Sequence, residues 1–441
     1  MTPIQAKALP ALLAGSDVIG QSKTGSGKTA AFAIPILQKI DVQSRVIQAL
    51  IICPTRELST QVAGEFRKLA RKFEGLQVLL LVGGQPARAQ IESLQGGVHI
   101  VVGTSGRILD LLDRRVLDLR SLKTVVMDEA DKLLEMGFEE EISAIMHSLP
   151  SNRQTVFFSA TFPQEIKKLS QSYQKNPLHI EVRDEDTSQN SIEEIAYELN
   201  QGITSEEKNQ ILLRVLQQHA TKAILIFCNQ KATVDELVRI ILAADVSCAA
   251  LHGDLEQRDR SLVMAMFRNG SYRILVATDV AARGLDIDHL DLVINFDFPQ
   301  GLDIYVHRIG RTGRAGRKGV AVTLVRQSDE LKLFEIEKAR GSKFERPVLG
   351  FKNQFGLSAL HREATMKTLW ISGGRKDKLR PGDILGALTG ENAGINTVKI
   401  GKIDIFDKMS LVAVSTELAE VAAEKLRNGK IKGRKFQVRL V

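Results

Sequence analysis

Cysteine is scarce in this sequence, which has only Cys53, Cys228 and Cys248 among its 441 residues. The three lie far apart, and none has a second cysteine or a histidine at the spacing of metal ligands. A disulfide framework or a zinc site is therefore not expected, and we predict that these cysteines are small buried residues.

Long apolar runs are also missing. The longest strings, such as Val78–Val82, have the length of a strand and fall far short of the roughly 20 residues of a membrane-spanning helix. The N-terminal apolar run is interrupted by Pro10 and lacks a basic leader beyond Lys7, unlike a signal sequence. We predict a cytoplasmic monomer with no membrane partner.

Positive charge is concentrated at one end of the chain. The formal net charge is +8, and Lys367–Val441 holds 15 Lys and Arg against 8 Asp and Glu, a surplus of 7. Such a basic module suits a polyanion. On charge alone, a solvated face without a partner is the alternative.

Short β-rich runs alternate with helical patterns such as Thr60–Phe73, and the runs are apolar on both faces, as buried parallel strands are. The first series comprises 49–53, 78–82, 98–102, 124–127 and 155–158, and the second 223–227, 248–251, 274–277, 292–295 and 321–325. The pattern predicts an α/β fold with two parallel-sheet domains in tandem.

The last segment has a different pattern. Its short elements are expected at 368–372, 384–388, 412–414, 416–428 (a helix) and 436–441 (a strand). They predict a small α+β domain of the RNA-recognition-motif type. With polar linkers at 183–191 and 341–365, the predicted domains are 1–182, 192–340 and 366–441.

A glycine-rich loop, Gly25-Ser26-Gly27-Lys28-Thr29, follows a short strand (Asp17–Gly20) and precedes a helical run. In such a loop backbone N–H groups close around phosphate oxygens, the Lys reaches the β/γ-phosphates and the Thr hydroxyl holds Mg²⁺. The strict pattern has Gly six residues before the Lys, where this chain has Ser22, so a plain glycine-rich turn is the alternative.

Two charged clusters complete this pattern. Asp128-Glu129-Ala130-Asp131 follows an apolar strand, where an acid can coordinate Mg²⁺ and its neighbour can activate water; a solvated helix start is the alternative. Far away, four arginines between Arg308 and Arg317 are spaced by glycines. Arginine presented to a γ-phosphate stabilises the transition state, so hydrolysis would require closure of the two domains.

Seven segments in this order resemble the successive motifs of DEAD-box RNA helicases, over about residues 1–325. They are Lys23–Thr29, Pro54–Leu58, Gly83–Gly84, Asp128–Asp131, Ser159–Thr161, Ala277–Ile287 and His307–Arg317. The resemblance implies two RecA-like lobes, ATP and Mg²⁺ as cofactors, and an RNA-dependent ATPase that unwinds short duplexes locally.

The resemblance also implies residue roles. For ATP these are Gln5 (adenine), Thr24, Gly25, Ser26, Gly27, Lys28 and Thr29 (phosphates), Asp286 (ribose), Thr29 and Asp128 (Mg²⁺, partly through water), Glu129 (the attacking water), and Arg311 and Arg314 (arginine fingers). Residues implied in coupling hydrolysis to lobe closure are Asp131, Ser159, Thr161 and His307. Residues implied in RNA backbone contact are Arg56, Gly84, Thr104, Arg107, Gln257, Arg260, Thr278 and Gly284.

The chain departs from the family pattern in three places. Ser105 stands where Pro is usual and Ser59 where Ala is usual, both small changes. The chain begins inside the motif of Gln5, without the aromatic residue expected upstream. A truncated N-terminus is one expectation from this, and the resemblance then does not imply full adenine recognition.

The last 76 residues resemble the C-terminal domain of DbpA-type bacterial DEAD-box proteins, through 368–374, 380–390 and 429–435. This implies binding to a 23S ribosomal RNA hairpin near the peptidyl-transferase centre and to pre-50S particles during large-subunit assembly. The usual base-stacking aromatics are missing apart from Trp370, itself more typical of a core. The predicted RNA contacts are therefore Lys376, Lys378, Arg380, Lys430, Lys432, Arg434 and Lys435.

Two alternatives stay open. A general RNA clamp or annealer that needs no turnover would need less of the catalytic set, but Lys28, Glu129, Arg311 and Arg314 are all present. An RNP-remodelling ATPase without a specific rRNA target needs the whole set and belongs to the same alternative. A DNA helicase is disfavoured by the complete motif order.

Overall fold

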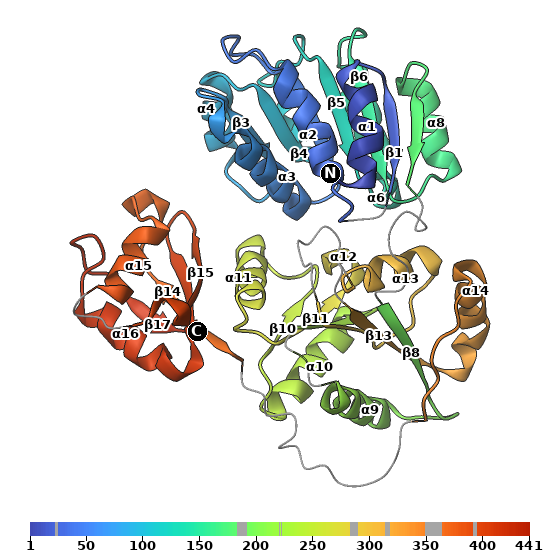
Figure 1. The fold of residues 1–441 in the computed structure, drawn as a ribbon, viewed down its shortest axis with the longest axis vertical. Helices are drawn as coiled ribbons and strands as arrows, with labels where there is room; N and C mark the ends of the chain where they lie inside the picture. Colours follow the sequence, from blue (N-terminus) through green and yellow to red (C-terminus); the bar gives the residue numbers. More distant parts are fainter. Residues whose placement is uncertain are drawn as a thin grey trace. The chain divides into compact units, whose positions relative to one another are not determined.

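The structure, a computed structural model, describes residues 1–22, 25–182, 192–219, 221, 223–282, 290–313, 318–348, 364–390 and 395–441. The described residues divide into two compact units, one within 1–182 and one within 192–441 (Figure 1).

The first unit, called lobe 1, is built on a seven-stranded sheet in the order β3-β4-β2-β5-β6-β1-β7, with every pair parallel. The strands are β1 (Val18–Gln21), β2 (Ala49–Cys53), β3 (Val78–Leu81), β4 (Ile100–Thr104), β5 (Thr124–Asp128), β6 (Gln154–Ser159) and β7 (Leu178–Glu181).

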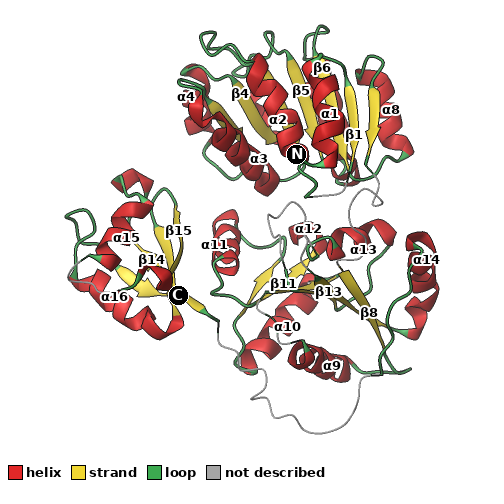
Figure 2. Ribbon diagram, viewed as in Figure 1, coloured by secondary structure: helices red, strands yellow, loops and turns green. Residues whose placement is uncertain are grey.

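Helices cover both faces of this sheet (Figure 2). They are α1 (Pro3–Leu13), α2 (Lys28–Lys39), α3 (Arg56–Leu69), α4 (Ala87–Gln95), α5 (Ser105–Asp113), α6 (Ala130–Glu135), α7 (Glu139–His147) and α8 (Gln164–Tyr173), with a 3-10 turn at Ala70–Lys72. Successive residues of one strand enter opposite cores: Ile51 packs with α1, α2 and α3, and Leu50 with α5, α7 and α8. This double burial is why the strands read as continuous apolar runs.

The second unit begins with lobe 2, whose six-stranded parallel sheet has the order β10-β11-β9-β12-β13-β8. The strands are β8 (Ile192–Glu198), β9 (Ile224–Cys228), β10 (Cys248–Leu251), β11 (Ile274–Thr278), β12 (Leu292–Asn295) and β13 (Gly319–Val325). The helices are α9 (Ser205–Gln218), α10 (Lys231–Ala243), α11 (Gln257–Arg268), α12 (Asp279–Ala282), α13 (Leu302–Ile309) and α14 (Glu330–Arg340), with a 3-10 turn at Gln327–Asp329.

The rest of the second unit is a small C-terminal module with an antiparallel sheet in the order β15-β16-β14-β17. Its strands are β14 (Met366–Ile371), β15 (Ile400–Ile405), β16 (Ser410–Ser415) and β17 (Val438–Leu440), and its helices are α15 (Pro381–Thr389) and α16 (Ala419–Asn428), with 3-10 turns at Arg375–Asp377, Thr397–Lys399 and Thr416–Leu418. Both helices pack on one face of the sheet, through Ile384, Leu388 and Leu426.

The predicted fold class is confirmed, with two parallel-sheet lobes followed by a small antiparallel domain. Single elements differ. The run 384–388, expected as a short element of unassigned type, lies in helix α15, and strands β7, β8 and β15 were not predicted. Helix α3 starts at Arg56, before the predicted residue 60, because the Thr55 hydroxyl accepts a hydrogen bond from the Leu58 N–H (3.2 Å) and so caps the helix.

The two predicted linkers lie largely outside the described residues. The described start of the second one packs on lobe 2, where Phe344 is buried and Glu345 forms a β-bridge with Ile195. The domain boundaries stay a prediction.

The three cysteines are buried, as predicted, and none of them forms a disulfide. Within the described ranges, no group of three or more His, Cys, Asp or Glu is arranged to hold a metal ion by itself. No helix in the described part of the chain is long and apolar enough to span a membrane.

Candidate functional site

The glycine-rich loop of lobe 1 leads directly into helix α2. Gly25 and Gly27 have φ values of +78° and +92°, a region in which glycine is favoured, and Gly27 is the N-cap of α2. A Cβ on Gly27 would lie 2.6 Å from Gln5 Nε2. The loop therefore needs glycine here, and it directs backbone N–H groups at the positive end of a helix, which suits an anion. Thr24, predicted in this loop, lies outside the described residues.

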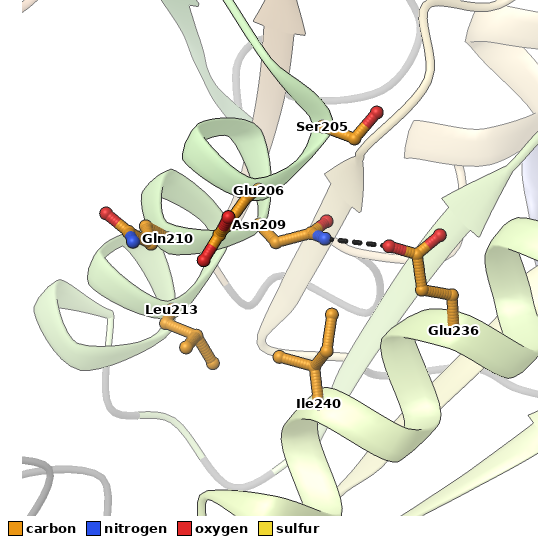
Figure 3. Close-up of a pocket in the computed structure, with 7 residues that line it drawn as sticks. All are labelled: Ser205, Glu206, Asn209, Gln210, Leu213, Glu236 and Ile240. Carbon is orange, nitrogen blue, oxygen red and sulfur yellow. Dashed lines mark hydrogen bonds between the residues drawn. The ribbon is translucent and has the colours of Figure 1, made fainter.

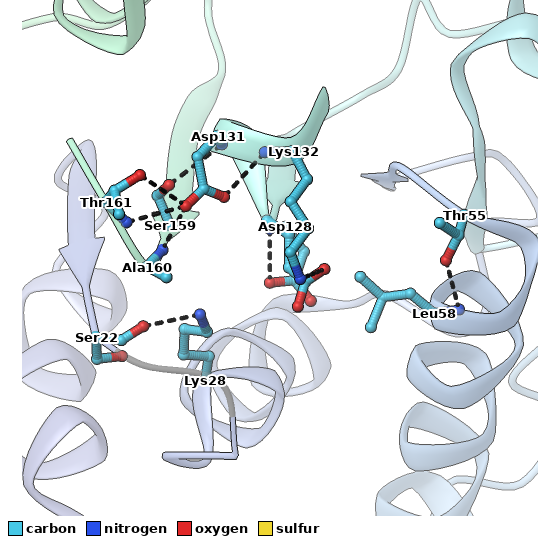
Figure 4. Close-up of polar contacts among 11 residues, drawn as sticks. Ser22, Lys28, Thr55, Leu58, Asp128, Asp131, Lys132, Ser159, Ala160 and Thr161 are labelled. Atoms are coloured by element: carbon cyan, nitrogen blue, oxygen red, sulfur yellow. Dashed lines mark hydrogen bonds and ion pairs between the residues drawn. The ribbon is translucent and has the colours of Figure 1, made fainter. Parts of the chain in front are cut away.

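Lys28 is buried, and its ammonium donates a hydrogen bond to the Ser22 carbonyl oxygen (2.9 Å; Figure 4). The Ser22 hydroxyl lies 2.9 Å from that of Ser26. The residue that departs from the strict loop pattern, Ser22, thus orients Lys28 through its backbone carbonyl. Thr29 follows in the first turn of α2.

Gln5 links the start of α1 to this loop. Its Oε1 accepts the Thr2 N–H (2.9 Å) and its Nε2 donates to the Gly27 carbonyl (3.2 Å). The structure thus places the predicted adenine contact against the phosphate loop.

Asp128 and Glu129 stand at the carboxyl end of β5, and both are buried. Burial raises the pKa of Asp128 to about 6, although the nearby Lys28 ammonium lowers it. Glu129 has φ +53°, an uncommon left-handed conformation for a non-glycine residue, and it begins α6.

The Glu129 carboxylate forms a buried ion pair with Lys132 Nζ at 2.7 Å. Lys132 was not among the residues predicted from the sequence. The available signal was its position three residues after Glu129, since residues at i and i+3 of a helix share a face.

Asp131 holds the loop after β6. Its Oδ2 accepts from the N–H groups of Ala160 (3.1 Å) and Thr161 (2.9 Å) and from the Thr161 hydroxyl (3.0 Å), while the Ser159 hydroxyl accepts the Asp131 N–H (3.2 Å; Figure 4). The structure therefore joins three residues predicted for coupling, Asp131, Ser159 and Thr161, in one network. His307, the fourth, lies on α13 of lobe 2.

The predicted RNA contacts of lobe 1 lie at the carboxyl ends of three adjacent strands, β3, β4 and β2. The Arg56 guanidinium lies so close to Gly83 that a Cβ there would be 2.9 Å from it, and Gly84 has φ +74°. Thr104 ends β4, and Arg107 donates to Gln90 Oε1 (2.9 Å).

In lobe 2 the described candidates also gather at strand ends. Gln257 and Arg260 lie in the first turn of α11, and Arg260 Nη2 donates to the Ala281 carbonyl (2.7 Å) beside Thr278 at the end of β11. Arg311 is buried just after α13. Gly284, Asp286 and Arg314 lie outside the described residues.

In the C-terminal module two basic segments, remote in sequence, lie side by side. Lys432 Nζ donates to the Lys378 carbonyl (2.9 Å) and lies 3.6 Å from Asp383 Oδ2. We call these segments, 375–380 and 430–435, the basic edge. Its exposed cationic residues are Arg375, Lys376, Lys378, Arg380, Lys430, Lys432, Arg434 and Lys435.

The sheet face that carries Trp370 is largely covered. Trp370 packs with Leu411 and Phe406 against Met266 of lobe 2, and Arg439 lies 4.3 Å above its ring. Thr368, two residues earlier on the same face, meets the side chains of Asn269 (2.9 Å) and Ser271 (2.7 Å). Trp370 is thus a packing residue at this contact, which favours the basic edge as the RNA-binding part of the module.

A separate cavity of about 490 Å³ lies between α9 and α10 (Figure 3). It is lined by Ser205, Glu206, Asn209, Gln210, Leu213, Glu236 and Ile240. Two carboxylates and no cation line it, so it repels phosphate and is not the nucleotide site.

Comparison with known proteins agrees with this geometry. The DEAD/DEAH box helicase family matches residues 2–169, the helicase conserved C-terminal domain matches 207–316, and the DbpA RNA binding domain matches 368–440. The ATP-dependent RNA helicase DbpA of Escherichia coli (strain K12) is 45% identical over 446 residues, covering 100% of this chain and 94% of that protein.

Two further proteins show how far the likeness extends. The DEAD-box ATP-dependent RNA helicase CshA of Geobacillus kaustophilus is 44% identical over 345 residues, covering 78% of this chain and 73% of that protein. The structure of S. cerevisiae Dbp5 bound to RNA and ADP BeF3 has a TM-score of 0.69 at 30% identity, covering 79% of this chain and 90% of that one.

Proposed function

This chain belongs to the DEAD-box family of ATP-dependent RNA helicases and is of the DbpA type, and from that premise we propose which side chains perform its reaction and which RNA it remodels. It is an RNA-stimulated ATPase and helicase. The observation that best supports the proposed site is the meeting of the phosphate loop, the Asp128–Glu129 pair and the Asp131 network at the strand ends of one sheet.

For nucleotide binding, the N–H groups of 24–29 hold the phosphates and Lys28 leaves Ser22 to reach the β/γ-phosphates. Gln5 reads the adenine and Asp286 the ribose. Thr29 and Asp128 would hold Mg²⁺, since their hydroxyl and carboxylate oxygens are the hard ligands that this ion prefers. When bound, the ion neutralises charge on the β- and γ-phosphates.

For hydrolysis, Glu129 accepts a proton from the water that attacks the γ-phosphorus, while the bond from phosphorus to the β,γ-bridging oxygen breaks. Lys132 holds the Glu129 carboxylate in place. Arg311 and Arg314 stabilise the charge of the transition state. Asp131, with Ser159, Thr161 and His307, transmits hydrolysis to the movement of the lobes.

For RNA binding, the lobes contact the sugar–phosphate backbone through Arg56, Gly84, Thr104, Arg107, Gln257, Arg260, Thr278 and Gly284. Backbone contacts position RNA without reading its sequence. Specificity therefore falls to the basic edge, which we propose binds a 23S ribosomal RNA hairpin near the peptidyl-transferase centre during assembly of the large subunit.

The test is the ATPase rate with three nucleic acids: a 23S fragment carrying the hairpin, an unrelated structured RNA, and single-stranded DNA. We expect the hairpin fragment to stimulate most and DNA not at all. Equal stimulation by both RNAs would leave a general RNA-remodelling ATPase, and RNA binding without turnover would indicate a clamp.

Two pairs of substitutions in the C-terminal module test whether the basic edge determines specificity for the hairpin. Lys376→Gln with Lys430→Gln removes two charges from the basic edge, while Lys399→Gln with Lys402→Gln removes two from elsewhere in the module. Lys432 is avoided because it holds the two basic segments together. Only the first pair should weaken hairpin binding and flatten its salt dependence, by a slope of about 0.7 to 0.9 per lost phosphate contact. Equal effects of both pairs would argue against the basic edge.

The domain boundaries 1–182, 192–340 and 366–441, the cytoplasmic location and the monomeric state are part of the same proposal.

A further inference from the structure

Arg308 is the most completely enclosed cation in the described part of lobe 2. It lies in α13, it is only 1% exposed, and its five N–H groups make five hydrogen bonds. Nε and Nη2 form a fork onto Asp279 (2.7 Å each), Nη2 also meets Asn229 Oδ1 (2.8 Å), and Nη1 meets the Asp297 carbonyl (2.7 Å) and Asn295 Oδ1 (3.3 Å). A guanidinium has five N–H donors, so this one is saturated and has none to offer a ligand.

These acceptors come from separate elements at the carboxyl end of the sheet. Asp279 opens α12 directly after β11, Asn229 follows β9, and Asn295 ends β12. Strands β11, β9 and β12 are consecutive in the sheet. Arg308 therefore fixes α13 to three neighbouring strand ends at once.

The charges around Arg308 explain how it is tolerated. Asp279 faces it with a bidentate geometry, Asp297 lies beside it and is itself paired with Lys208 (2.8 Å), and the Phe227 ring lies 5.1 Å away. A buried ion pair is frequently no more stabilising than an apolar replacement, whereas removal of one partner alone is strongly destabilising. Net stability is thus a poor reason for such a residue, and fixing one arrangement of the elements is a better one.

The ion pair between Arg308 and Asp279 joins α13 to α12, and the residues next to this pair have different predicted ligands. Thr278, directly before Asp279, is a proposed RNA contact, and Arg311, three residues after Arg308, is a proposed ATP contact. We propose that Arg308 is a positioning residue that ties α12 to α13, so that RNA bound at Thr278 sets the placement of Arg311. This inference rests on the proposed roles of Thr278 and Arg311.

The test uses Arg308→Lys, which keeps the charge but loses the fork, and Asp279→Asn, which keeps the shape but loses the charge. Steady-state ATPase is measured with and without saturating RNA. We expect the ratio of RNA-saturated to RNA-free kcat to fall at least tenfold in each variant. The KM for ATP and the RNA concentration for half-maximal stimulation should change less than threefold. The double variant should be no worse than the more affected single one.

Tyr305→Phe is the matched control. Tyr305 lies on the same helix, is fully buried and hydrogen-bonds to the Glu194 carboxylate, but it is not among the partners of Arg308. It should lower the melting temperature and leave the stimulation ratio unchanged. If Arg308→Lys does not fold, Asn229→Ala, which removes one of five acceptors, should give a smaller fall in the same ratio.

Three results would overturn the proposal. An unchanged ratio in folded Asp279→Asn would make Arg308 merely structural. A more than tenfold rise in the RNA requirement with normal kcat would place it in the RNA site, and a similar rise in KM for ATP would place it in the nucleotide site. Failure of the proposed function is distinct, because the unmodified protein would then show no RNA stimulation.

Discussion

Both lobes bury charged side chains at the carboxyl ends of their parallel strands, but the charges are satisfied to different degrees. In lobe 1, burial raises the pKa of Asp128 to about 6, and the Lys28 ammonium, which has three donors, meets one acceptor among the described residues, the Ser22 carbonyl. In lobe 2, Arg308 meets five acceptors and Lys208 is paired with Asp297.

This difference distinguishes a ligand-binding site in lobe 1 from a structural framework in lobe 2. A buried charge that lacks partners is kept at a cost in stability, and it gains its partners when ligand arrives. A saturated charge has nothing to offer a ligand and instead fixes the elements around it. We therefore predict that substitutions of Lys28, Asp128 and their buried charged neighbours in lobe 1 change activity more than stability. Substitutions of Arg308, Lys208 and their partners in lobe 2 should change stability more than activity, or should change the coupling of ATP hydrolysis to RNA binding.

Glu129→Gln should show the largest effect on activity. We expect kcat to fall at least about 100-fold because the general base is lost, whereas ATP and RNA binding persist because the Gln oxygen can still accept from Lys132. Single-turnover hydrolysis and equilibrium binding measure the two effects, with the exposed Glu140→Gln as control. Turnover within threefold of the unmodified protein would exclude Glu129 as the base.

Lys208→Met should show the opposite behaviour in lobe 2. Loss of one partner of a buried pair should destabilise the lobe by about 3 to 5 kcal/mol without raising the KM for ATP. Hydrogen exchange of the β12 amides reports this lobe separately from the rest of the chain. The control is Lys231→Met, which breaks an exposed pair with Asp254 and should leave that exchange unchanged. Loss of ATP binding with normal exchange would contradict the comparison.

The strands with apolar residues on both faces were predictable, because a parallel sheet covered by helices needs exactly such runs. The strands that were missed have other patterns. β8 contains three Glu residues and lies at the edge of its sheet, and β15 has no fully buried residue. The run 384–388 is ambiguous by itself, because a short apolar segment fits a strand or a helix; Pro381 at the first position of α15 was the available signal.

The site could be predicted in its residue types but not in its partners. The motif order selected Lys28, Asp128 and Asp131, which the fold brings to the end of one sheet. Lys132 was passed over, and Arg308 was noted only as one of four arginines near a γ-phosphate, because the roles of both depend on contacts across the fold. Nothing in the sequence shows that Arg308 reaches three strand ends, since its partners lie up to 79 residues away.

Asp128→Asn should stabilise the ligand-free protein. The folded-state pKa of about 6 lies above the ordinary value of 3.8, so the folded state binds the proton more tightly. The destabilisation therefore grows as pH rises from about 4 to 6 and is complete above that range, on the order of 3 kcal/mol. Denaturation of both proteins without nucleotide, from pH 4 to 8, should give a difference near zero at the acid end and a plateau above about pH 6. A difference that does not vary with pH would show that burial does not perturb this carboxylate.

Thr161→Ala should have the smallest effect. It tests whether the Asp131 network of lobe 1 belongs to the catalytic site or to the structural framework around it. The substitution removes one hydrogen bond to Asp131 and leaves those from the Ala160 and Thr161 N–H groups, so we expect a loss of about 1 kcal/mol in stability. The loop after β6 keeps its position but has one hydrogen bond fewer to Asp131. The rate of RNA-stimulated hydrolysis should therefore stay within twofold of that of the unmodified protein, while the amount of duplex unwound per ATP falls severalfold. Ser172→Ala, which removes an exposed hydroxyl bonded within α8, is the control. If unwinding and hydrolysis fall together, the Asp131 network belongs to the catalytic site; if neither falls, the backbone bonds alone carry the coupling.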